Sequence, residues 1–161
     1  MIITSKLTGP MRFDTDIRGH KITVGQPVKS GGDDSGPTPP ELLATSLGTC
    51  VGVYALFFCT KHDIDPTGME VTTEYAKAEH PARLVDFVVT VTLPASIAEE
   101  LKEPFLATVQ KCLIHNTLHE PPAVEIRLGE PEHVSEKDIR EMRGALPNIS
   151  LDDIRDEGDR L

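Results

Sequence analysis

Tryptophan is absent from this chain of 161 residues and aromatic residues make up only 4% of it, so the core must consist mainly of Val, Leu, Ile and Ala. Basic residues are also scarce, since 16 Lys and Arg stand against 26 Asp and Glu, a formal net charge of −10. A surface of that sign repels phosphates, which argues against a nucleic-acid or anionic-membrane partner. The length suffices for one domain with a hydrophobic core and an appendage.

Cysteine is the next residue in short supply, with three in the whole chain. Three cysteines do not make the disulfide framework of a small secreted domain. The N-terminal sequence MIITSKLTGP also lacks the apolar stretch of a secretory signal. We therefore expect a cytoplasmic protein whose cysteines are reactive, metal-binding or simply buried.

One long stretch carries no charge, residues 42–60. Threonine, serine and glycine dilute its hydrophobicity, acidic residues flank it, and no basic cluster orients it as a membrane span. Because it is apolar on all sides, the sequence predicts a buried central helix over residues 41–61.

Strands are predicted on both sides of this helix. Residues 1–8 and 19–24 indicate short strands with a strand or turn between them, and 30–40 is a loop rich in Gly, Asp, Ser and Pro. After the helix, residues 69–79 and 83–93 alternate apolar and polar side chains as a hairpin does. The order of elements predicts an α+β fold with antiparallel sheets.

A second helix is expected after Pro94, with Ser96 and Glu99 as a capping box. Its apolar stripe consists of Ile97, Leu101, Phe105, Val109 and Cys112. A short helix over 113–120 and a final strand over 123–128 would complete a domain of residues 1–128. Residues 129–161 hold ten acidic and five basic side chains and are expected to form an acidic, partly helical C-terminal extension.

The cysteines suggest a chemistry. Cys50 and Cys59 are nine residues apart, so on one helix they point to opposite faces about 13 Å apart along the axis and cannot form a disulfide. Cys112 is then the only other intrachain partner. A thiolate can attack a peroxide O–O bond and become a sulfenic acid, which a second thiol condenses into a disulfide. The first thiol needs a nearby cation, for which Arg12 and Arg18 are candidates.

Two other interpretations stay open at this point. Cys112, His115 and His119 have the types and spacing of zinc ligands, although a closed site needs a fourth. An apolar pocket beside Cys50, lined by residues such as Leu47, Val51 and Tyr54, would instead make the protein a non-catalytic binding module for a lipid-like ligand. Cys59, next to two phenylalanines, is expected to be a buried space-filling residue.

Two segments carry a resemblance to a known family. The run Gly36–Cys50, GPTPPELLATSLGTC, and the run Lys111–Leu118, KCLIHNTL, resemble the two cysteine motifs of the OsmC/Ohr family, the osmotically inducible and organic hydroperoxide resistance proteins. The resemblance implies antiparallel sheets around two long central helices in an intertwined homodimer. It also implies an antioxidant peroxidase without a cofactor, in which Cys50 reacts with an organic hydroperoxide, Cys112 resolves the sulfenic acid and a dithiol, such as a lipoyl group, recycles the disulfide.

The same resemblance assigns two further site residues. The family's arginine corresponds to Arg12, with Arg18 in reserve, and its glutamate to Glu41. The family's glutamate precedes the first cysteine by ten residues, whereas Glu41 precedes Cys50 by nine, and Leu113 stands where a proline is usual. These departures place the chain closer to the uncharacterised OsmC-like branch than to the established peroxidases.

Overall fold

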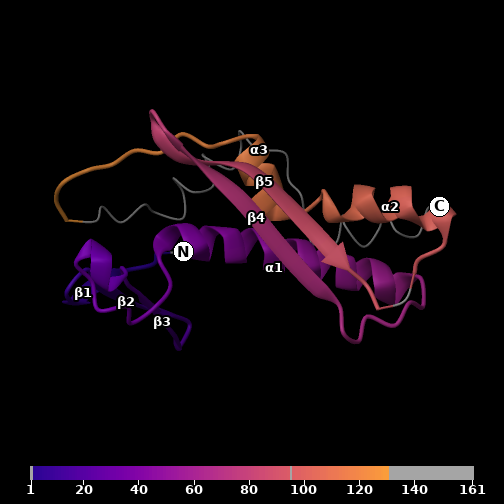
Figure 1. Cartoon of the computed structure of the whole chain (residues 1–161), viewed down its shortest axis with the longest axis horizontal. Helices are drawn as coiled ribbons and strands as arrows, with labels where there is room; N and C mark the ends of the chain where they lie inside the picture. Colours follow the sequence, from indigo (N-terminus) through magenta and orange to yellow (C-terminus); the bar gives the residue numbers. More distant parts are fainter. Residues whose placement is uncertain (1, 95, 131–161) are drawn as a thin grey trace. The chain divides into compact units, whose positions relative to one another are not determined.

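The computed structural model describes residues 2–94 and 96–130 (Figure 1). The chain divides into two compact units, Met1–Pro122 and Ala123–Leu161, and the helices and strands of the described residues lie in the first. Their order is β1 (Ser5–Gly9), β2 (Arg12–Ile17), β3 (His20–Val24), the short 3-10 helix η1 (Val28–Ser30), α1 (Pro39–Lys61), β4 (Glu70–Glu79), β5 (Ala82–Thr92), α2 (Glu99–Val109) and α3 (Leu113–His119). This mixture confirms the predicted α+β class.

The N-terminal strands form an antiparallel sheet in the order β1-β2-β3. Arg18 and Gly19 connect β2 to β3, and both have positive φ angles of 57° and 84°. Two successive residues in this conformation make the tight turn that matches the twist of a hairpin. The predicted strands are therefore present, and Arg18 lies exposed in a turn between two of them.

Helix α1 begins where the sequence supplies a cap. The backbone N–H of Thr38 donates a 2.7 Å hydrogen bond to the Glu41 carboxylate, and two prolines occupy the first turn. One side of α1 is buried in the core, through residues such as Leu47, Val51, Ala55 and Phe58. Within the described residues, α1 is the helix that is long and apolar enough to cross a membrane, with a mean hydropathy of 1.9. Its buried side confirms that the uncharged stretch forms a core helix.

Strands β4 and β5 form the predicted antiparallel hairpin, which packs against α1 (Figure 1). The inner face of β5 carries Phe87, Val89 and Val91, as the alternation predicts. Two glycines let the helix approach β4 closely. A Cβ at Gly48 would lie only 2.4 Å from the Thr73 hydroxyl oxygen, and one at Gly52 would lie 3.2 Å from a Val71 methyl group.

The predicted stripe of the second helix is confirmed in part, because Phe105, Val109 and Cys112 are buried in the core, although Cys112 follows the helix. The predicted start of that helix is wrong. Helix α2 begins at Glu99 with Ala98 as its N-cap residue and no side-chain cap, so Glu99 lies in the first position rather than the third. The chain stays extended through Ala98, which lets Ile97 pack against the core, and Ser96 lines a pocket instead of capping a helix.

The strand predicted over 123–128 is not formed. Val124, Ile126 and Leu128 are between 81% and 105% exposed, and the segment pairs with no strand of the described residues. Alternating side chains indicate a strand only where another strand offers hydrogen bonds, which a single chain does not supply here. The acidic, partly helical extension expected over 129–161 lies outside the described residues from residue 131 onward.

Candidate active site

The structure brings Cys50 and Cys112 together. Cys50 lies on α1 and is partly exposed, whereas Cys112 follows α2 and its side chain is fully buried. All three cysteines are free thiols. Burial raises the pKa of the Cys112 thiol above its usual 9.0, and a hydrogen bond with the Cys50 side chain raises it further. The two sulfurs therefore form a pair with one accessible member and one sheltered member.

Local structure holds Cys112 in place. It is the N-cap residue of α3, and its sulfur accepts a hydrogen bond from the backbone N–H of His115 at 3.4 Å. Upstream, the apolar stripe of α2 anchors the same residue to the core against α1. Hydrogen bonding from the start of α3 lowers the pKa of Cys112, but burial and Cys50 outweigh this effect. At neutral pH the thiol of Cys112 is consequently protonated.

Tyr54 belongs to the same group of side chains. It lies one helical turn beyond Cys50, so both residues are on the same face of α1, and both pack against the core cluster that contains Cys112. Burial raises the pKa of Tyr54 above 10.0, and the two cysteines raise it further. The sequence predicts Tyr54 only as part of a pocket wall, although its spacing of four residues from Cys50 also indicates this position.

The predicted charged residues lie elsewhere in the unit. Arg12 donates hydrogen bonds to the Thr8 carbonyl at 2.9 Å and to Asp33 at 3.2 Å, within the N-terminal sheet and the loop that follows it. Glu41 caps α1, and the Thr38 backbone N–H lowers the pKa of its carboxyl group. Nine residues of helix put about 13 Å of axial rise between Glu41 and Cys50. Within one chain, the structure therefore joins the two thiols but not these charged groups to them.

The proposed zinc ligands do not converge. The rings of His115 and His119 stack in parallel with centroids 6.1 Å apart, and Nδ1 of His115 lies 3.0 Å from the Gln110 carbonyl oxygen. Across residues 2–94 and 96–130, no three Cys, His, Asp or Glu side chains gather as a metal site would require. Cys59 is fully buried in α1, and burial raises its pKa, as expected of a space-filling thiol.

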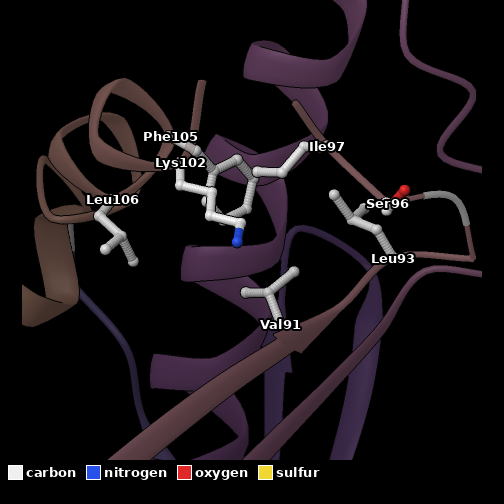
Figure 2. A pocket seen from close by; sticks show the side chains of 7 residues that line it. All are labelled: Val91, Leu93, Ser96, Ile97, Lys102, Phe105 and Leu106. Carbon is white, nitrogen blue, oxygen red and sulfur yellow. The ribbon is translucent and has the colours of Figure 1, made fainter. Parts of the chain in front are cut away.

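Two hollows mark the surface of this unit. One, of about 330 Å³, lies between the end of β5 and α2, where the Lys102 amine points past Phe105 toward Val91 (Figure 2). The other, of about 580 Å³, follows the small residues of α1 alongside β4. Neither is lined by a cysteine. Leu47 and Val51, expected to line a pocket beside Cys50, are instead buried in the core.

The protein thus belongs to the class of α+β proteins in which a long central helix carries one cysteine, Cys50, beside a second, Cys112, that follows another helix. The family described as OsmC-like protein matches residues 32–127, a segment that holds both cysteines, and the chain belongs to this family. No curated protein matches the sequence.

Solved structures share the fold. An OsmC-like protein from Mycoplasma pneumoniae has a TM-score of 0.64 at 18% identity, with 74% of this chain and 87% of that one covered. The organic hydroperoxide resistance protein OsmC from Legionella pneumophila has a TM-score of 0.56 at 15% identity, covering 73% and 89%. An organic hydroperoxide resistance protein from Elizabethkingia anophelis has a TM-score of 0.56 at 17% identity, covering 75% and 90%.

Proposed function

We propose that this protein is a thiol-dependent peroxidase that reduces organic hydroperoxides. The observation that carries the proposal is the pairing of a partly exposed Cys50 with a fully buried Cys112. The names of the Legionella and Elizabethkingia proteins, which share the fold, support the substrate class. The family match supports the general chemistry, since it spans both thiols.

The difference in exposure between the two thiols assigns the order in which they react. Cys50 is the thiol that a peroxide can reach, and its thiolate attacks the outer peroxide oxygen, giving a sulfenic acid and releasing an alcohol. Cys112 is sheltered and protonated, so it does not compete for the peroxide. Its sulfur then displaces the sulfenic oxygen as water and leaves a Cys50–Cys112 disulfide. An external dithiol, of which lipoyl groups are an example, reduces this disulfide by thiol exchange.

An intertwined homodimer completes the site in this proposal. Leu43, Val53, Leu56 and Phe57 are apolar residues of α1 that stay 38% to 54% exposed, and only 39% of the helix's most apolar window is buried within one chain. Large exposed apolar surfaces mark interaction sites, and a second copy offers a matching one. The dimer would bring Arg12, with Arg18 in reserve, to the Cys50 thiolate and let Glu41 orient that arginine. It would also give residues 123–128 a strand to pair with.

The test measures hydroperoxide consumption by the purified protein with a dithiol as reductant. Wild type should consume tert-butyl hydroperoxide, Cys50→Ser should be inactive, and Cys112→Ser should react once and stall as a sulfenic acid. Cys59→Ser is the matched control, because it removes an equally buried thiol outside the pair and should keep full turnover. Equal consumption by wild type and Cys50→Ser would contradict the peroxidase and favour the alternative, a binding module for an apolar ligand at the dimer interface.

A further inference from the structure

Disulfide formation between the paired cysteines poses a problem of proton transfer. The buried Cys112 thiol holds a proton that has to leave before or during its attack, while the oxygen departing from Cys50 has to gain one. In a displacement at sulfur, the incoming and departing atoms lie on opposite sides of the attacked atom. The thiol proton therefore cannot pass directly from Cys112 to the departing oxygen, and a group that reaches both can carry it.

Tyr54 is placed for that task. It shares the face of α1 with Cys50, one turn away, and it packs against the cluster that contains Cys112. Its ring is held edge-on by Phe57, with centroids 6.0 Å apart, which limits its motion. Among the residues that the structure describes, no hydrogen-bond partner occupies its hydroxyl group. A phenol both donates and accepts hydrogen bonds, so one hydroxyl can serve both sulfurs.

We infer that the Tyr54 hydroxyl relays the proton of the Cys112 thiol to the oxygen that leaves Cys50. The inference rests on the proposed peroxidase function and names a catalytic residue for its second step. The step balances without another reagent. As the S–S bond forms and the S–O bond of the sulfenic acid breaks, Tyr54 gives its proton to the departing hydroxide and takes the proton of Cys112, so that water leaves and the phenol is restored.

The electrostatic surroundings suit this role. Burial and both cysteines hold the pKa of Tyr54 above 10.0, so the phenol keeps its proton between turnovers even when Cys50 is a thiolate. A group that had already lost its proton could not donate to the departing oxygen. The raised pKa of Cys112 has the complementary effect, since a thiol that rarely ionises unaided depends on a relay.

The test separates the two chemical steps in single-turnover reactions with tert-butyl hydroperoxide and no reductant. A 1,3-dione that traps sulfenic acids reports the first step, and, in a parallel reaction without the trap, the loss of the Cys112 thiol by mass spectrometry reports the second. Tyr54→Phe should form the sulfenic acid at nearly the wild-type rate and the disulfide at least about 100-fold more slowly, the usual size of an acid–base contribution. Tyr75→Phe is the matched control, because it removes the hydroxyl of the only other tyrosine in the sequence and should leave both steps unchanged.

The pH dependence distinguishes a proton relay from a packing defect. In Tyr54→Phe the rate of disulfide formation should rise toward that of wild type at the alkaline pH where Cys112 ionises, because a thiolate has no proton to transfer. Disulfide formation at the wild-type rate, or a slowing of both steps that pH does not relieve, would overturn the relay and leave the peroxidase standing. A wild-type protein that consumes no hydroperoxide would remove both.

Discussion

The close approach of α1 to β4 can be tested by whether a single substitution raises or lowers the free energy of unfolding. Replacing Gly48 by Ala inside a helix normally stabilises a protein by about 1 kcal/mol, because alanine loses less conformational freedom on folding. Here the added Cβ would lie 2.4 Å from the Thr73 hydroxyl oxygen, and overpacking of that kind costs about 1–3 kcal/mol. We therefore expect Gly48→Ala to lower the free energy of unfolding by about 1 kcal/mol.

Gly48→Ala should raise the free energy of unfolding instead once the Thr73 hydroxyl group is removed. In a Thr73→Ala background the nearest remaining atoms are the Cβ of residue 73 and a Val71 methyl group, both at 3.7 Å, an ordinary contact distance. Gly48→Ala should then stabilise the protein by about 1 kcal/mol, so the coupling between the two positions is about 2 kcal/mol.

Urea unfolding of the four proteins at one fixed concentration measures this cycle, because the proposed dimer would make stability depend on concentration. Gly52→Ala is the control, since its Cβ would meet only a methyl group at 3.2 Å and should show little coupling to Thr73. If Gly48→Ala stabilised the protein equally in both backgrounds, the helix would not approach the strand as described.

Three further outcomes are expected. Phe105→Ala should lower the free energy of unfolding by about 3–5 kcal/mol, because the Phe105 ring is 6% exposed. Leu106→Ala, at a 56% exposed position, should lower it by less than about 0.5 kcal/mol. Equal losses in urea unfolding would show that α2 does not cover the core. A backbone N–H lowers the pKa of Glu41 below 4.5, so its charge stabilises the fold above that pH and less as acid protonates it. Glu41→Gln should be less stable than wild type at neutral pH, and a gap that did not shrink as the pH fell through the lowered pKa of Glu41 would contradict this linkage. Phe57→Glu, at a 54% exposed position, should convert a dimer into monomers in sedimentation experiments, and an unchanged dimer would place the interface elsewhere.

Much of the fold is determined by local patterns that a sequence displays. The uncharged run predicts α1 because a helix that is apolar on all sides has to be central, and the alternation of β5 assigns Phe87 and Val89 to the inner face. The stripe that ends at Cys112 likewise predicts that this thiol faces α1. These features depend on side-chain periodicity, which needs no knowledge of distant contacts.

The predictions that are wrong or incomplete concern features whose structure depends on tertiary contacts. The capping pattern at Ser96 is overridden because Ile97 packs into the core and delays the start of α2. The strand predicted over 123–128 has the right alternation but lacks a neighbour within one chain. The relation of Tyr54 to both thiols, rather than to Cys50 alone, depends on how α2 and α3 return to α1, which no local pattern encodes.

The sulfur of Cys112 accepts the backbone N–H of His115, so the first turn of α3 is fastened by an atom that is also chemically reactive. Alkylating or oxidising that atom weakens it as an acceptor and frees the amide to exchange with solvent. Hydrogen–deuterium exchange at the His115 amide thus reports whether the Cys112 sulfur is modified. Fraying of the first turn of α3 accompanies every covalent change at that sulfur.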